Sequence, residues 1–168
     1  NVSQKDGEIL VNGPLAGVSR RPFFRYTLKI AVSQDGRIAF DLRGQVADNA
    51  VWLPRLGFEF RLPYDLQAFR YYGHGPAESY CDSYHHAPCG LYESEAAKEY
   101  VPYVRPQEHG NHYGVRELTI KKAFTVRSPQ AFEAAVSRYS AKQLYKAAHT
   151  DELGESSHTY LRVDYKDS

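Results

Sequence analysis

The sequence predicts an all-β protein built as an antiparallel sandwich, and three observations support this class. Apolar and polar side chains alternate in several short segments, which is the pattern of half-buried strands. Turn residues separate these segments, as expected where each strand is followed by an antiparallel neighbour. Tyrosine, which is enriched in sheets and at amphipathic surfaces, accounts for 14 of the 168 residues.

The first elements follow from this alternation. Residues 1–7 are polar and are expected to form a ragged end, and Glu8–Val11 predicts a short strand. Apolar side chains then alternate over Phe24–Val32 and again over Ile38–Leu42, with Asp35-Gly36 between the two segments. An Asp-Gly pair between two alternating segments is a strong signal for a β-hairpin.

Two more strands are predicted at Leu56–Leu62 and Gln67–Tyr72, separated by the turn Pro63-Tyr64-Asp65. No period holds from Ser83 to Gln107, because proline and glycine interrupt it repeatedly. We therefore expect a long loop with a short helix at Ser94–Tyr100. Loops of this length in a compact domain are usually functional or contact a partner.

The last third of the chain predicts further strands and one helix. The strands are expected at 114–121, 123–126, 132–138 and Leu161–Tyr165. Ser140 followed by Gln143 is a capping-box pattern, which predicts a short helix near 141–149. Because the chain ends at Ser168 without a closing element, the sandwich is expected to be C-terminally incomplete, and its open edge is expected to favour self-association.

Length, charge and composition limit the class of protein. The 168 residues are expected to form a single domain over residues 1–168, and the net charge of +1 argues against nucleic acid or an anionic membrane as the main partner. There is no methionine, so Asn1 is not a translation start, and the simplest interpretation is a piece of a longer polypeptide. Such a piece need not contain the active site of the whole protein.

The segment Tyr72–Asp82, which reads YGHGPAESYCD, is the most informative part of the chain. Glycine and proline impose a tight turn, and carboxylates flank it. Either these groups hold a flat polar ligand such as a sugar, or they only satisfy nearby backbone N–H groups. We predict a structural turn formed by Tyr72, Gly73, Gly75, Pro76, Glu78 and Asp82.

One cluster of cysteines and histidines has the residue types of a zinc site but not the spacing. The candidate ligands in the loop are Cys81, His85, His86 and Cys89. Thiolates and imidazoles are the ligands that zinc prefers, but this spacing matches no known zinc module, and adjacent histidines rarely converge on one ion. Two cysteines form no disulfide framework and fit a reducing compartment.

Acid–base chemistry remains open at this stage. A glycosidase needs two carboxylates at a set separation, and the candidates are Glu78, Asp82, Glu108 and Glu117. Glu117 lies within a predicted strand, where a cross-strand ion pair is the simpler role. His74 together with His109 or His112 is a second candidate for an acid and a base.

Several blocks together are similar to one family. In chain order they are Leu53–Gly57, Tyr72–Asp82, Tyr100–Asn111, Arg116–Leu118, Ser137–Ser140 and Gln143-Leu144. Over roughly residues 50–165 they resemble the C-terminal domain, of the small-chain or domain 5 type, of glycoside hydrolase family 2 β-galactosidases. The resemblance implies a super-sandwich like that of galactose mutarotases. It also implies a parent enzyme that hydrolyses terminal β-galactosides such as lactose with retention.

The same resemblance implies that the catalytic glutamates, and most of the magnesium and sodium sites, belong to a (β/α)8 barrel that this sequence lacks. We therefore expect no catalytic residue, no metal ligand and no cofactor in this segment, and no hydrolysis by it alone. The expected partners are the β-galactoside of the parent, its barrel domain and further copies of the enzyme, in the cytoplasm.

The expected role is structural and pocket-shaping. Glu108, His109 and Asn111 are predicted to contact the substrate pocket or a neighbouring domain, and the Tyr72–Asp82 turn is predicted to orient them. Two alternatives remain. A carbohydrate-binding module without catalysis would need exposed aromatic rings, and an aldose 1-epimerase-like protein would need two histidines and a glutamate in one cleft.

Overall fold

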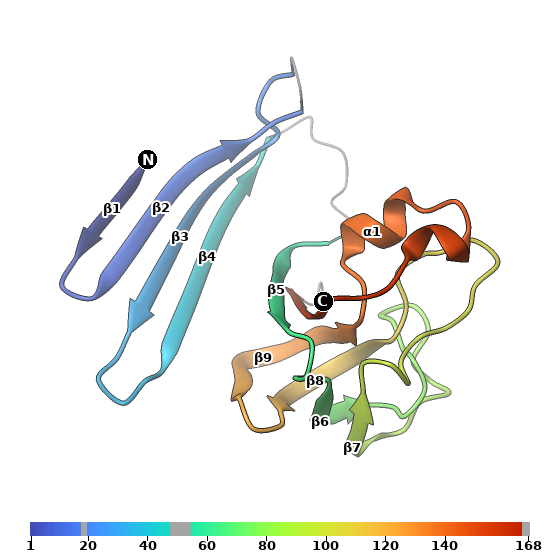
Figure 1. Cartoon of the computed structure of the whole chain (residues 1–168). Helices are drawn as coiled ribbons and strands as arrows, with labels where there is room; N and C mark the ends of the chain where they lie inside the picture. Colours follow the sequence, from blue (N-terminus) through green and yellow to red (C-terminus); the bar gives the residue numbers. More distant parts are fainter. Residues whose placement is uncertain (18–19, 48–54, 166–168) are drawn as a thin grey trace. The chain divides into compact units, whose positions relative to one another are not determined.

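The computed structural model describes residues 1–17, 20–47 and 55–165, and the chain divides into two compact units, Asn1–Leu53 and Pro54–Ser168 (Figure 1). Each unit contains one antiparallel sheet, and the only α-helix among the described residues lies in the second. The predicted all-β class with one short helix is thus confirmed, and two antiparallel sheets are consistent with a sandwich. The expectation of a single domain over residues 1–168 remains a prediction.

The first unit is a four-stranded sheet in the order β1-β2-β3-β4. Its strands are β1 Val2–Lys5, β2 Glu8–Leu15, β3 Phe24–Val32 and β4 Ile38–Val46. The predicted β3–β4 hairpin is confirmed, with Val32 opposite Ile38 across the turn. The expected ragged end is wrong, because β1 pairs with β2 across Asp6 and Gly7, which both adopt the positive φ of a tight hairpin turn.

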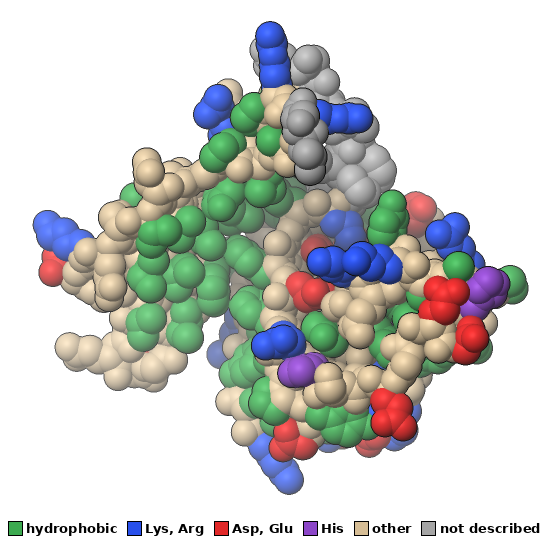
Figure 2. All heavy atoms as spheres, turned by 45° about the horizontal axis from the view of Figure 1, so that its top comes forward, with side chains coloured by type: hydrophobic (Ala, Val, Ile, Leu, Met, Phe, Trp, Pro, Cys, Tyr) green, Lys and Arg blue, Asp and Glu red, His purple; other side chains and the backbone are tan. Residues whose placement is uncertain are grey.

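One face of this first sheet is apolar across β2, β3 and β4. Directly opposed residues share a face, and Ile9, Ile30 and Phe40 are in register across β2, β3 and β4. Val32 and Ile38 continue the face and are 55% and 56% exposed. Figure 2 shows this green surface towards the left of the view.

The second unit contains a six-stranded antiparallel sheet in the order β5-β10-β9-β8-β6-β7. Its strands are β5 Gly57–Pro63, β6 Ala68–His74, β7 Cys89–Glu95, β8 Asn111–Ile120, β9 Phe124–Ser137 and β10 His158–Tyr165. The last predicted strand is therefore an internal one, paired with β5 on one side and with β9 on the other. The core of this unit includes Phe69, Leu118 and Leu161, which are fully buried.

Two predicted elements of the second unit are wrong. The helix expected at Ser94–Tyr100 is a single turn after β7, in which Lys98 and Glu99 donate their amides to the Glu95 carbonyl oxygen. The strands expected at 123–126 and 132–138 are one strand, β9. Its pairing with β8 skips the stretch around Pro129, and an irregularity of this kind accommodates a proline that cannot donate a pairing bond.

The predicted capping box is present. The Ser140 side chain accepts a hydrogen bond from the Gln143 amide, and the Gln143 side chain accepts one from the Ser140 amide. This box opens α1, Ala141–Lys146, which is shorter than predicted and is followed by a 3-10 helix, η1, Thr150–Leu153. Leu144 anchors α1 in a second small cluster with Ala147 and Leu153. Within the described ranges, no helix has the length and apolar character needed to cross a membrane.

Candidate functional site

An ion network around Glu108 is partly buried in the second unit. Glu108 lies in the loop before β8 and pairs with both Arg55 and Arg162, and the Arg162 Nη1 atom is 2.8 Å from its Oε1 atom. Arg55 also pairs with Asp164, with 2.9 Å between the Nη2 and Oδ2 atoms. Arg162 is only 4% exposed. The network therefore joins β10, the loop before β8 and the segment before β5.

Strand alternation determines which side chains enter this network. On β10, Leu161 packs into the apolar core, so Arg162 and Asp164 do not share its environment. Asp164 lies directly opposite Glu133 of β9 and Gly57 of β5. A side chain at Gly57 would collide with Asp164 and with the neighbouring backbone, so glycine leaves the space that the Asp164 carboxylate occupies.

Burial shifts the ionisation of these groups. It raises the pKa of Asp164, although Arg55 and Arg162 oppose the shift. Burial likewise raises the pKa of Glu133, and the nearby charge of Asp164 adds to the rise while Asn111 and Arg55 oppose it. The two carboxylates face one another across the sheet, where like charges are unfavourable. Arg55 opposes the rise in pKa at both carboxylates, and Arg162 opposes it at Asp164.

Asn111 connects this network to the glycine-rich turn. Its Nδ2 atom donates to the Ser79 carbonyl oxygen at 2.8 Å and to Glu133 at 2.7 Å. Its Oδ1 atom accepts from Arg55 at 2.9 Å. Asn111 is 1% exposed, and its neutral amide donates and accepts at once, which satisfies three neighbouring groups.

Glu78, one of the predicted turn residues, accepts three hydrogen bonds from separate parts of the chain. The donors are the Tyr80 hydroxyl at 3.0 Å, the Gly110 amide at 2.9 Å and the Tyr103 hydroxyl. The bond to Glu78 raises the pKa of Tyr103 to about 12, and burial raises the pKa of Tyr80. The turn and the loop before β8 are thereby tied together through one carboxylate.

Replacing Glu78 by glutamine is expected to lower the pH at which Tyr103 ionises. Because the folded-state pKa of Tyr103 is raised, its hydrogen bond to Glu78 stabilises the protein fully below the unfolded phenol pKa of about 10. This stabilisation is lost as pH rises towards about 12. In Glu78→Gln the loss should begin at lower pH, because a neutral amide does not oppose phenolate formation. Phenolate ultraviolet absorbance, compared with that of Glu78→Gln combined with Tyr103→Phe, isolates this group. An unchanged titration in Glu95→Gln is the control, and an unchanged titration in Glu78→Gln contradicts the prediction.

His109, the second predicted contact residue, is buried and does not reach solvent. It is 2% exposed, its Nδ1 atom is 2.9 Å from the Gln107 carbonyl oxygen, and its ring meets that of Tyr100 edge-on at 5.0 Å. Its carbonyl oxygen faces Arg162 Nη2 at 3.5 Å. Burial lowers the pKa of His109, and the positive charge of Arg162 adds to the effect.

Acidification is expected to destabilise the protein through His109. Because the folded-state pKa is lowered, the unfolded chain binds a proton more readily, and stability is lost as pH falls through the unfolded value of about 6.5. His109→Gln should flatten the dependence of the unfolding free energy on pH between about 7 and 5. His149→Gln, at an exposed position, should leave that dependence intact. Urea titrations at several pH values measure both, and equal slopes in the two variants would refute this role.

Of the remaining turn residues, two are buried and three are exposed. Gly73 is buried against Val115, and a side chain at Gly75 would overlap the Tyr71 hydroxyl. Tyr72, Pro76 and Asp82 are exposed, and the described residues give the Asp82 side chain no hydrogen bond or ion pair. Of the predicted turn residues, Glu78 is hydrogen-bonded to the loop that carries Glu108 and His109, through the Gly110 amide, whereas Gly73 and Gly75 are buried elsewhere and the other three are exposed. The contact and turn roles remain predictions.

The other acid–base candidates are held in local pairs. Glu117 pairs with Arg127 on the adjacent strand, as a cross-strand pair. His112 is fully buried, with its Nε2 atom 3.1 Å from Glu99 and its ring stacked on Tyr71. The His74 Nδ1 atom is 2.7 Å from the Ala87 carbonyl oxygen. None of these groups lines either of the two best-formed pockets among the described residues.

In the part of the chain that the structure describes, the four candidate zinc ligands have no contact partner in common. Cys81 and Cys89 are free and exposed. His85 stacks on Tyr84, and the His86 Nε2 atom is 2.9 Å from the Glu78 carbonyl oxygen. Over the described ranges, no three histidine, cysteine or acidic side chains are grouped to hold a metal ion.

Sequence reasoning missed four residues of the network: Arg55, Glu133, Arg162 and Asp164. Arg162 and Asp164 alternate with Leu161 and Val163, which is the ordinary pattern of a strand with one solvated face. The spacing of two charges on one face was visible, but their burial depends on the loop before β8 and on Arg55, which are distant in sequence. No local signal distinguishes this arrangement from a solvated face.

Fold and site together define an antiparallel β protein in which charged side chains of β10, the loop before β8 and the segment before β5 pair with one another. Comparison with known proteins identifies the family of the chain. The family described as β-galactosidase small chain matches residues 3–168. A β-galactosidase of Actinobacillus pleuropneumoniae is 32% identical over 98% of this chain and 16% of its own length, and one of Streptococcus thermophilus is 40% identical over 66% of the chain and 11% of its own length. The β-galactosidase BgaC of Bifidobacterium adolescentis is 32% identical over 83% of the chain and 14% of its own length.

The chain belongs to the β-galactosidase small-chain family, because the family match covers nearly all of it. It spans 16% or less of the length of these three relatives.

Proposed function

We propose that this chain serves as a structural segment of a β-galactosidase that hydrolyses terminal β-galactosides such as lactose with retention. The family match over residues 3–168 is the observation that carries the proposal. The relatives are named β-galactosidases and are several times longer than this chain, which supports a larger parent enzyme as its partner. In this proposal the chain is inactive alone, and the parent acts in the cytoplasm.

The buried network supports a bracing role. Glu108 and Glu78 use their carboxylate oxygens to hold arginines, phenols and a backbone amide, and both therefore serve neighbouring groups in the fold. In a retaining glycosidase one carboxylate must attack the sugar ring and another must transfer a proton, whereas Glu108 and Glu78 hold groups of the fold. The proposal assigns the magnesium and sodium of the parent, which the resemblance implies, to no residue of this chain.

The test begins with the purified 168-residue chain and a chromogenic β-galactoside. No turnover above buffer is expected, and turnover that disappears in Glu108→Gln would overturn the proposal. The matched segment of the Actinobacillus enzyme can then be deleted or exchanged for this chain. The deletion should abolish activity and the exchange should restore a measurable part of it. An active deletion variant, or an exchanged enzyme that folds but has no activity, would also count against the proposal.

A further inference from the structure

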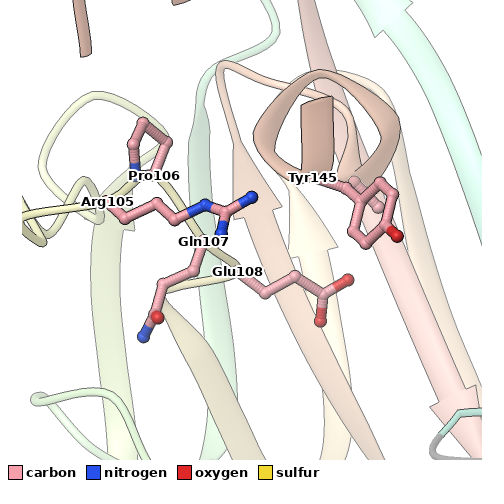
Figure 3. A pocket seen from close by; sticks show the side chains of 6 residues that line it. Arg105, Pro106, Gln107, Glu108 and Tyr145 are labelled. Carbon is pink, nitrogen blue, oxygen red and sulfur yellow. The ribbon is translucent and has the colours of Figure 1, made fainter. Parts of the chain in front are cut away.

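A pocket of about 390 Å³ lies between the loop before β8 and α1 (Figure 3). It is lined by Arg105, Pro106, Gln107, Glu108, Ala141 and Tyr145. Its volume falls within the range of small-molecule sites, about 300–1,000 Å³. All six residues belong to the second unit, so the pocket is complete within it.

Tyr145 presents an aromatic ring that the fold does not use. It is 83% exposed, whereas α1 contributes Leu144 to the core. Across the described part of the chain it makes no ring contact and no hydrogen bond. A tyrosine combines an apolar ring face with a polar hydroxyl, so an unused exposed ring offers a surface for a ligand of similar character.

The polar side chains that line the pocket have hydrogen-bonding groups without a partner in the described part of the fold. Among the described residues, the side chains of Arg105 and Gln107 have no hydrogen-bonding or ion-pair partner. Glu108 is held in place by Arg55 and Arg162, which engage only part of the roughly four lone-pair sites of a carboxylate. In Figure 3 the Arg105 guanidinium and the Glu108 carboxylate extend towards Tyr145, while the Gln107 carboxamide points away from it.

We propose that this pocket is a non-catalytic binding site for a neutral pyranose sugar. A ring face, a fixed acceptor at Glu108 and a donor at Arg105 match the apolar face and the neighbouring hydroxyl groups of a pyranose. Arg105 disfavours a cation, and the hydroxyl groups of a neutral sugar can use both the Glu108 acceptor and the Arg105 donor. Because two arginines fix the Glu108 carboxylate, little side-chain entropy is lost when a hydroxyl binds to it. The choice of a galactoside as the probe rests on the proposed function.

The test is a titration of the purified chain with methyl β-galactoside, followed by backbone amide chemical shifts. Saturable shifts confined to residues 105, 107, 108 and 141–145 are expected. Tyr145→Ala and Arg105→Gln should each weaken binding by about tenfold or more, as for a central contact in a small interface. The matched controls are Tyr165→Ala and Arg116→Gln, at exposed positions outside the pocket, and both should leave affinity unchanged.

Absence of saturable shifts, shifts elsewhere in the chain, or equal affinity in Tyr145→Ala and the native protein would each overturn the site. Tighter binding of galacturonate than of methyl β-galactoside would overturn the assignment to a neutral sugar. These outcomes are independent of the hydrolysis tests above. A chain that restores activity to the relative but binds no sugar here would retain the proposed function and lose this site.

Discussion

Replacing Asn111 by aspartate is expected to destabilise the protein by about 3 kcal/mol at neutral pH, since the change leaves buried acceptors without donors and adds a buried charge. The native amide donates to the Ser79 carbonyl oxygen and to Glu133, and a carboxylate donates to neither. Burial already raises the pKa of Glu133, so a second carboxylate at this position must share a proton with it.

The effect of this substitution should depend on pH in a defined direction. A shared proton raises the folded-state pKa of the pair above the unfolded values near about 4, so stabilisation is present at low pH and is lost as pH rises. Asn111→Asp should therefore be closer to the native protein at about pH 4.5 than at about pH 8. Urea unfolding at both pH values provides the measurement. The matched control is Asn12→Asp, an exposed site on β2, where a change of less than about 0.5 kcal/mol is expected. A pH-independent loss would contradict the shared-proton argument.

Replacing Arg162 by methionine is expected to cost about 3–5 kcal/mol, the usual result of removing one member of a buried ion pair. The side chain is 4% exposed, and its loss leaves Glu108 and Asp164 with Arg55 as their remaining cationic partner. The two carboxylates would then compete for one guanidinium. Arg162→Lys should recover part of the loss, because lysine keeps the charge but not the planar guanidinium that reaches Glu108 and the His109 carbonyl oxygen together.

The matched control for Arg162 is Arg43→Met, which breaks an exposed pair with Asp41 of 3.1 Å. Exposed pairs contribute about 0–1 kcal/mol and weaken with salt. The loss of stability caused by Arg43→Met should therefore shrink at high ionic strength, whereas the loss caused by Arg162→Met should change less. Denaturant midpoints of the native protein and of both variants at low and high ionic strength measure this. If Arg162→Met and Arg43→Met cost the same, the network is a surface feature and the bracing role fails.

Sequence patterns predicted the strands whose two faces differ in character. The β3–β4 hairpin, β5 and β10 all alternate strictly, because one face of each is apolar. The errors occurred where this contrast disappears. The stretch Val2–Lys5 is polar and exposed on both faces, and it is a strand only because β2 offers a partner across a tight turn. Charged residues beside alanine at Glu95–Glu99 suggested a helix, whereas the pairing of β7 with β6 extends through Glu95.

Three of the candidate residues, Glu108, Asn111 and Glu78, were named from a polar loop and a glycine-rich turn. The structure joins Glu108 and Asn111 through Arg55 and bonds Glu78 to the Gly110 amide, and their contact and turn roles stay predictions. Tyr145 had no local signal, because an exposed aromatic on a short helix looks the same whether or not a pocket adjoins it. The pocket arises only where the loop before β8 approaches α1.

By itself the sequence determined the all-β class, the capped helix and the family, because strand alternation, the capping box and the ordered blocks are properties of neighbouring residues. Only the tertiary structure decided that Arg162 and Asp164 are buried, that Glu108 lies between two arginines, and that Asn111 joins the network to the glycine-rich turn. The reason is physical. The energy of a charge depends on which groups exclude water from it and which opposite charges approach it, and here those groups lie more than fifty residues apart along the chain.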